Sequence, residues 1–160
     1  MTIRPATPDD IPLIAALIRE LAAYEKLAHE AVATEDTLRA TLFGEKPGAE
    51  VAIAELDGTP AGFALFFPNF STFLGQPGIY LEDLFVRPEF RARGVGRALL
   101  VHLAGLAVER GCGRLEWAVL DWNAPAIGFY KKLGAEPMRE WTTFRLAGDA
   151  LARLARDRTA

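Results

Sequence analysis

The feature that most constrains the fold is the alternation of apolar strands with helices in the second half of the chain. The expected order is strand, helix, strand, helix and strand, over 79–86, 94–109, 114–120, 123–132 and 141–146. Gly111 and Gly134 follow the two predicted helices and support their boundaries, because glycine readily ends a helix. A helix between two strands provides the crossover that parallel pairing requires, so this half predicts an α/β sheet.

The first half predicts antiparallel strands that extend the same sheet. Residues 51–56 and 61–67 are expected to form strands, and Asp57-Gly58 between them is typical of a tight hairpin turn. Two helices are expected between a short strand at residues 2–5 and this hairpin. We therefore expect a mixed sheet of about six to seven strands, flanked by helices on both faces. A chain of 160 residues suits one domain, with a core at about residues 3–150.

Composition limits the partners that the protein can bind. A net charge of −3 and a pI near 5.5 leave no excess of Lys and Arg for contact with nucleic acid. No apolar run is long enough to span a bilayer, and the N-terminus carries no apolar signal segment. Cys112 is the only cysteine, which excludes an intrachain disulfide and suits a reducing compartment. We therefore expect a cytoplasmic protein that binds small or cationic partners, and neither nucleic acid nor a membrane.

The segment Arg-Ala-Arg-Gly-Val-Gly-Arg at 91–97 lies between a predicted strand and a predicted helix. The first N–H groups of a helix have no partner within the helix, and the helix dipole adds partial positive charge, so this position attracts phosphate. Gly94 and Gly96 lack the Cβ atoms that would keep a ligand away from the backbone, and the three arginines supply positive charge. The segment therefore predicts a site for a phosphate or pyrophosphate.

Better-known phosphate loops fit this segment less well. A dinucleotide-binding fingerprint needs a small residue where Leu99 stands, although Glu116 lies at a suitable distance downstream. A P-loop needs Lys followed by Ser or Thr after its last glycine, whereas Arg97 and Ala98 stand there. From local features alone, a tight loop with solvated arginines is the alternative to anion binding.

Several motifs, in order along the chain, resemble the GNAT superfamily of N-acetyltransferases. Arg-x-x-Gly-x-Gly at 91–96 resembles its coenzyme A pyrophosphate loop, and Tyr-Leu-Glu-Asp-Leu-Phe-Val at 80–86 resembles the strand before that loop. Asn-x-Pro-Ala-x-x-Phe-Tyr-x-x-Leu-Gly at 123–134 resembles the helix after it. Ile-Arg-Pro-Ala-Thr at 3–7 and Glu-Leu-Ala-Ala-Tyr-Glu at 20–25 resemble the diamine (spermidine/spermine) acetyltransferase branch. The resemblance implies one N-acetyltransferase domain with the GNAT fold.

The resemblance also implies how acetyl-CoA, the expected cosubstrate, is held. Main-chain groups of Leu84, Phe85 and Val86 are expected to bind the pantetheine arm. The pyrophosphate loop and the last helix supply the other expected contacts, from Arg91, Ala92, Arg93, Gly94, Val95, Gly96 and Arg97 and from Asn123, Ala126, Tyr130 and Lys132.

Acetyl transfer to a primary amine requires a group that removes a proton, because an alkylamine with a pKa near ~10.4 is mostly protonated at neutral pH. Glu82, near the end of its strand, is the predicted general base, acting directly or through a water, and the resemblance gives its counterpart that role. Strand alternation sends Glu82 and Asp83 to opposite faces, so only one of them is expected in the cleft. An exposed strand glutamate without a catalytic role is the alternative.

The coenzyme A thiolate that leaves during acetyl transfer needs a proton. Tyr130 is the predicted general acid, because the resemblance directs its counterpart at the coenzyme sulfur. Neighbours on a helix point about ~100° apart, so we assign Phe129 to packing and Tyr130 to chemistry, with a core position for Tyr130 as the alternative. Together, Glu82 and Tyr130 predict direct attack of the amine in a ternary complex.

Two other chemistries are not favoured by the sequence. Cys112 lies past a helix C-terminus, where the dipole disfavours a thiolate, and this argues against an acetyl-cysteine intermediate. His29 and His102 lack accompanying acidic or sulfur ligands, so no metal site is predicted.

The acceptor is expected to be a small di- or polyamine, or a basic amino-acid analogue such as thialysine. Resemblance to the diamine branch and the supply of acidic residues give the expected substrate site, formed by Tyr24, Glu25, Glu82, Glu116, Trp117 and Glu140. The resemblance also implies a homodimer. The alternatives are an acceptor at a protein N-terminus or lysine, and a CoA-binding module without catalysis, which the presence of both Glu82 and Tyr130 argues against.

Overall fold

The computed structural model describes residues 1–156 and divides the chain into two compact units, residues 1–118 and the part from Val119 onward. The first unit contains β1 (Thr2–Pro5), α1 (Ile11–Tyr24), α2 (Glu35–Phe43), β2 (Glu50–Leu56), β3 (Thr59–Ser71), β4 (Gln76–Val86), α3 (Val95–Glu109) and β5 (Leu115–Trp117). Short 3₁₀ turns lie at Pro8–Asp10, Ala28–Glu30 and Pro88–Phe90. The second unit contains α4 (Ala124–Lys132) and α5 (Gly148–Arg156).

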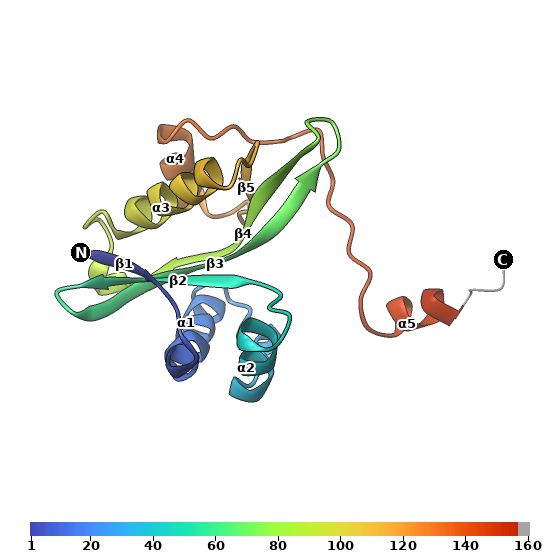
Figure 1. Cartoon of the computed structure of the whole chain (residues 1–160), viewed down its shortest axis with the longest axis horizontal. Coiled ribbons are helices and arrows are strands. Elements are labelled where there is room, and N and C mark those ends of the chain that lie inside the picture. Colours follow the sequence, from blue (N-terminus) through green and yellow to red (C-terminus); the bar gives the residue numbers. More distant parts are fainter. Residues whose placement is uncertain (157–160) are drawn as a thin grey trace. The chain divides into compact units, whose positions relative to one another are not determined.

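A single mixed sheet organises the first unit. Its strands lie in the order β1-β2-β3-β4-β5, with antiparallel pairing from β1 to β4 and parallel pairing between β4 and β5. Helix α3 makes the crossover between the two parallel strands, as the sequence predicts. In Figure 1, α1 and α2 lie on one face of the sheet and α3 lies on the other. The expected α/β architecture with helices on both faces is confirmed.

One face of the sheet packs against α1 and α2. Apolar residues recur along α1 with the helical period, and those on the inner side are buried. The resulting core contains Ile11, Ile14, Leu17 and Leu21 of α1, Leu38 and Leu42 of α2, and Val51, Ile53, Phe63 and Phe85 of the sheet. Because full burial of such a side chain contributes about 1.5–3 kcal/mol, this layer holds α1 and α2 firmly against the sheet.

The opposite face packs against α3 with smaller side chains. Ala52, Ala54 and Ala64 alternate with the residues of the first core and are buried, with at most 1% of each residue exposed. Helix α3 contributes Leu99 and Leu103, which are also fully buried. Small residues on the sheet let the helix approach this face closely.

The C-terminal region differs from the sequence expectation. Within residues 1–156 the sheet has five strands, fewer than expected, because β5 ends at Trp117 and residues 141–146 form no strand. A strand needs a neighbouring backbone to complete its hydrogen bonds, and side-chain preference alone does not supply one. Trp141 and Phe144 are 72% and 92% exposed, as suits a segment without such a neighbour. Helix α5 was not expected from the sequence.

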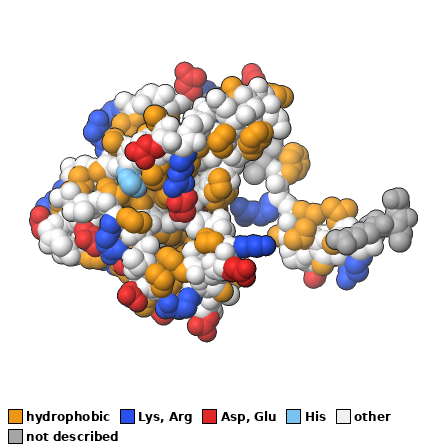
Figure 2. All heavy atoms as spheres, in the orientation of Figure 1, with side chains coloured by type: hydrophobic (Ala, Val, Ile, Leu, Met, Phe, Trp, Pro, Cys, Tyr) orange, Lys and Arg blue, Asp and Glu red, His pale blue; other side chains and the backbone are white. Residues whose placement is uncertain are grey.

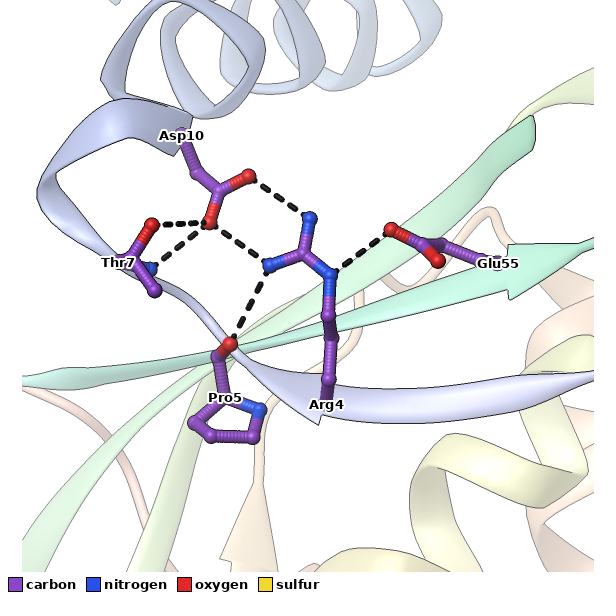
Figure 3. Close-up of polar contacts among 5 residues, drawn as sticks. All are labelled: Arg4, Pro5, Thr7, Asp10 and Glu55. Carbon is purple, nitrogen blue, oxygen red and sulfur yellow. Dashed lines mark hydrogen bonds and ion pairs between the residues drawn. The ribbon is translucent and has the colours of Figure 1, made fainter. Parts of the chain in front are cut away.

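A polar cluster joins β1 to the start of α1 (Figure 3). The Arg4 guanidinium donates two hydrogen bonds of 2.8 Å to the Asp10 carboxylate, and its Nε donates a third of 2.8 Å to Glu55 on β2. Asp10 also accepts hydrogen bonds from the backbone N–H and the hydroxyl of Thr7. The hydrogen bonds from Arg4 hold the pKa of the Asp10 carboxyl well below its usual range. The cluster therefore fixes where α1 leaves the sheet.

The surface of the first unit mixes charges of both signs. On the face shown in Figure 2, acidic and basic side chains are interspersed with apolar ones. The longest helix among residues 1–156 is α3, with 15 residues, and none of the described helices is long and apolar enough to cross a membrane.

Candidate active site

The segment between β4 and α3 forms an open turn at the start of the helix. Ala92 and Gly94 both adopt left-handed backbone, with φ of 58° and 84°. The first hydrogen bond of α3 runs from the Ala98 N–H to the Gly94 carbonyl at 2.9 Å, so the N–H groups of residues 95–97 precede it and stay available. A Cβ built on Gly94 would meet no described atom within 4 Å, so the turn faces open space. This geometry fits the expected pyrophosphate loop.

The three arginines of this turn are placed differently. Arg91 reaches back toward the sheet, where its Nε donates a hydrogen bond of 3.0 Å to the Val86 carbonyl. Its guanidinium lies 4.5 Å from the centre of the Tyr24 ring at the end of α1. Arg93 and Arg97 are exposed on the turn and the first helical turn. Arg93 lies 3.8 Å from the carboxylate of Asp57 and stays half exposed, and Arg97 faces solvent, whereas Arg91 links the turn to β4 and α1.

Strand β4 contains a bulge at Glu82. In the ladder between β3 and β4, Asp83 pairs with Leu65 and Leu81 pairs with Phe66, which leaves Glu82 without an opposite residue. An extra residue of this kind interrupts the alternation of side chains and redirects the strand, often beside an active site. The expectation that Glu82 and Asp83 point to opposite faces assumes an unbroken ladder, and the bulge interrupts the ladder at this position.

β4 and β5 part just before this bulge. Their parallel ladder runs from Ile79, opposite Leu115, to Leu81, opposite Trp117. β4 then continues to its last residue and pairs only with β3 among residues 1–118. Half of the backbone N–H and C=O groups of residues 82–86 therefore face an open edge. Of the residues with expected main-chain contacts, Leu84 and Val86 turn their backbone groups to this edge, where the Val86 carbonyl accepts the hydrogen bond from Arg91. The register directs the backbone groups of Phe85 toward β3, and its side chain packs in the core.

Three carboxyl groups come together at the bulge. The pKa of Asp83 is raised to about 6, first by burial and then by the negative charges of Glu82 and Glu25. Burial also raises the pKa of Glu25, which directly follows α1. The Glu82 residue is exposed. We call Glu25, Glu82 and Asp83 the carboxyl trio. The sequence favoured Glu82 over Asp83 for the cleft, although two adjacent acidic residues in an otherwise apolar strand are a signal for both.

Glu116 and Trp117 lie on β5, beside β4. Glu116 is the neighbour of Tyr80 in the parallel ladder. Its carboxylate accepts a hydrogen bond of 2.9 Å from the Asn69 amide and lies 2.8 Å from the Nε of Arg114. Glu116 therefore lies beside β4, and its carboxylate already has an amide and a cation as partners. The sequence pattern singled out neither Asn69 nor Arg114.

Tyr80 lies between Glu82 and Glu116. Its ring packs against Phe67, with the ring centres 5.3 Å apart. Burial raises the pKa of the Tyr80 phenol, and the charges of Glu82 and Glu116 raise it further. The two rings therefore form an apolar surface close to Glu82 and Glu116.

The remaining residues expected to bind the cofactor belong to the second unit and are described within it. The Asn123 side chain caps α4 by accepting a hydrogen bond of 3.3 Å from the N–H of Ala126. The Tyr130 ring lies 5.4 Å from the ring of its neighbour on the helix, and Lys132 is exposed at the end of α4. The roles of these residues, and that of Glu140 in an exposed turn of the same unit, stay predictions.

Comparisons with known proteins agree with one another. Residues 15–135 match the family model described as the acetyltransferase (GNAT) family. Thialysine N-epsilon-acetyltransferase of Bos taurus is 41% identical, over 96% of this chain and 96% of that protein. L-ornithine N5-acetyltransferase of Arabidopsis thaliana is 38% identical, over 93% of this chain and 85% of that protein. Among solved structures, an integron cassette protein from the mobile metagenome of V. cholerae has a TM-score of 0.81 at 30% identity and covers 96% of each chain.

Proposed function

This chain belongs to the acetyltransferase (GNAT) family and is an N-acetyltransferase, and from this premise we propose that it acetylates the terminal amine of a small dibasic acceptor with acetyl-CoA as the donor. The acceptor class includes di- and polyamines and basic amino acids. The observation that carries the proposal is the carboxyl trio beside the open edge of β4. The names of the thialysine and ornithine enzymes support it, because both of these acceptors are basic amino acids.

The turn before α3 fits the phosphate-bearing part of acetyl-CoA. The left-handed backbone at Ala92 and Gly94 turns successive N–H groups toward open space, at the positive end of the α3 dipole. Arg93 and Arg97 add positive charge there, and residues 84–86 are proposed to hold the pantetheine arm through their main chain. When bound, acetyl-CoA supplies the activated acetyl group.

The carboxyl trio prepares the acceptor for reaction. Glu82 takes a proton from the reacting ammonium, directly or through a water, which leaves a neutral amine able to attack. Because the pKa of Asp83 is about 6, this carboxyl is mostly ionised at neutral pH and attracts the same ammonium. Tyr130 donates a proton to the thiolate of coenzyme A as it leaves. Glu82 thus removes a proton from the amine, and Tyr130 supplies one to the leaving group. We also expect a cytoplasmic homodimer, as the resemblance to the diamine branch implies.

Thiol release measured over a panel of amines tests the proposal. The panel contains 1,3-diaminopropane, spermidine, ornithine, thialysine, propylamine and a lysine-containing peptide, with rates corrected for the free-amine fraction at one pH. A second charged contact favours the dibasic acceptors, so their kcat/KM should exceed that of propylamine by roughly tenfold or more.

The variant Glu25→Gln should reduce that advantage, whereas Glu45→Gln, which changes an exposed carboxylate before β2, should leave it unchanged. Equal kcat/KM values for propylamine and the dibasic amines would reject the dibasic acceptor but not the acetyltransferase. Preference for the peptide would indicate a protein substrate, and no thiol release with any amine would indicate a CoA-binding module without catalysis.

A further inference from the structure

We propose that Arg87 is a positioning residue for the acceptor site and that, together with Arg91, it holds the last turn of α1 and the adjoining Glu25 against β4. The inference rests on the proposed function, in which Glu25 gives dibasic amines their advantage. Arg87 is expected to act on the acceptor only through α1, because its side chain bonds to that helix and to β3.

Apolar packing ends before α1 does. Leu21 is the last buried residue of the helix, whereas Tyr24 is exposed and Glu25 is half-buried. The Glu25 N–H donates a hydrogen bond of 2.9 Å to the Leu21 carbonyl, so Glu25 moves with the last turn. The core therefore fixes α1 as far as Leu21, and contacts of other kinds set the position of the turn that follows.

Arg87 provides the first of these contacts. It directly follows β4, and its guanidinium donates two hydrogen bonds, of 2.9 and 2.8 Å, to the two carboxylate oxygens of Glu20 on α1. The guanidinium also donates to the Pro60 carbonyl at 3.1 Å, and the backbone N–H donates to the Ala61 carbonyl at 2.9 Å. A two-pronged contact of this kind fixes direction as well as distance. Glu20 is therefore tied to the sheet through Arg87.

Arg91 provides the second contact, four residues later. Its Nε donates a hydrogen bond of 3.0 Å to the Val86 carbonyl, and its guanidinium lies 4.5 Å from the centre of the Tyr24 ring. Glu20 and Tyr24 are also four positions apart, so they lie on the same side of α1. Both contacts therefore reach one side of the end of the helix. We call Glu20, Tyr24, Arg87 and Arg91 the clasp.

The clasp opposes repulsion within the carboxyl trio. Glu25 directly follows Tyr24, and its negative charge acts on the buried carboxyl of Asp83 on β4. Like charges repel, so the end of α1 is pushed away from β4 until a cation binds between them. A tether that resists this repulsion keeps the trio together before the acceptor arrives. An acceptor with two ammonium groups then meets a preformed site, which lowers the cost of binding.

The variant Arg87→Gln tests the inference through substrate preference. It should lower the ratio of kcat/KM for 1,3-diaminopropane to that for propylamine by about threefold to tenfold, mainly through KM of the diamine. Propylamine has no second ammonium and should react nearly as before. Arg87→Lys keeps the charge and should recover part of the ratio. A residue that only stabilised the fold would affect both amines equally.

The dependence on Glu25 gives a sharper test. Because Arg87 acts through Glu25, Arg87→Gln should change the ratio little in a protein that already carries Glu25→Gln. Two residues that act independently would instead show additive effects. Glu20→Ala breaks the same pair from the side of α1 and should lower the ratio to a similar extent, so the test does not depend on the folding of one variant.

A matched pair elsewhere in the first unit provides the control. Arg110→Gln breaks the hydrogen bonds of 2.6 and 2.8 Å to Glu50, beyond the far end of α3, and should leave the ratio unchanged. If Arg87→Gln and Glu20→Ala left the ratio unchanged, or if the effects of Arg87→Gln and Glu25→Gln were additive, the inference would fail while the dibasic acceptor stood. If the wild type showed no preference for diaminopropane over propylamine, the dibasic acceptor would itself fail, and the inference with it.

Discussion

Asp83 places a carboxylate where burial and neighbouring charges oppose its ionisation. Its pKa rises from 3.8 to about 6 in the folded protein, so the folded chain binds a proton more readily than the unfolded chain. The protonated carboxyl contributes its full share to the free energy of unfolding below about pH 4. This contribution is lost as pH rises to about 6 and above, because the buried carboxyl then ionises. An unfavourable buried negative charge of this kind is typical of a functional site, and here it suits the binding of a cation.

The variant Asp83→Asn removes the buried charge and should therefore stabilise the protein at neutral pH. We expect the free energy of unfolding to rise by about 1–2 kcal/mol at pH 7.5 and to change little at pH 4, as measured by urea denaturation. Activity toward dibasic amines should fall in the same variant. A stability change of equal size at both pH values would show that the effect does not come from ionisation.

Tyr130→Phe removes the phenol proton donor and keeps the ring. If Tyr130 protonates the thiolate, turnover should fall by roughly ten- to ten-thousand-fold while affinity for acetyl-CoA, measured by calorimetry, stays nearly the same. Phe129→Leu on the same helix is the matched comparison and should lower stability more than turnover. Full activity of Tyr130→Phe would assign Tyr130 to packing.

At the scale of elements, the start of α3 is shaped to bring backbone close to a ligand. Gly94 has a φ of 84° and open space where a Cβ would lie, so a larger residue would add both local strain and an obstacle to the ligand. Gly111, just after the other end of α3, has a φ of 66° and similarly open space. Substitution of either glycine should therefore strain the backbone to a similar extent, but only Gly94 lies in the pyrophosphate loop.

Gly94→Val should weaken acetyl-CoA binding by about tenfold or more, because the backbone N–H groups of the turn lose their close approach to phosphate. Gly111→Val should destabilise the fold to a similar extent and leave the affinity unchanged. Calorimetry with both folded variants separates the two effects. Equal affinity in the two variants would remove the pyrophosphate role from the turn.

The Arg4 cluster stabilises the junction of β1 and α1 through ionised Asp10. Because the pKa of Asp10 is lowered in the fold, its contribution is present above about pH 4 and is lost as pH falls below that value. Asp10→Asn should therefore lower the free energy of unfolding by about 1–2 kcal/mol at pH 7, and this deficit should shrink toward pH 3. Urea denaturation of Asp10→Asn and of Asp9→Asn, which changes an exposed neighbour, gives the comparison. A deficit that did not change with pH would point to lost packing.

At the scale of the whole molecule, the net charge is −3, and acidic and basic side chains are interspersed on the face shown in Figure 2. The carboxyl trio, in contrast, gathers negative charge at one place. Attraction of a dibasic acceptor should therefore come from the carboxyl trio and not from a long-range field. The kcat/KM advantage of 1,3-diaminopropane over propylamine should narrow when ionic strength rises from about 0.01 to 0.5 M, because salt screens partly exposed charges. A ratio independent of salt would indicate an apolar acceptor site.

Local signals in the sequence were sufficient for most of the architecture. The Asp57-Gly58 turn, the apolar period of α1 and the glycines that end α3 and α4 depend on residues a few positions apart, so their structures follow from short-range preferences. The order of strand, helix and strand around α3 then implies the parallel pair of β4 and β5. The open turn at Gly94 was predictable for the same reason, because it is a property of one short segment.

Only the tertiary structure decided how distant residues meet at the site. The bulge at Glu82 depends on the register between β3 and β4, and it interrupts the ladder where Asp83 meets the charges of Glu82 and Glu25. Glu25 and Glu116 reach β4 from other elements, and the burial and the shifted pKa of Asp83 arise only from such packing. The segment 141–146 has the composition of a strand but no strand beside it in the described chain. Register, burial and pairing are properties of two segments at once, and no pattern within one segment contains them.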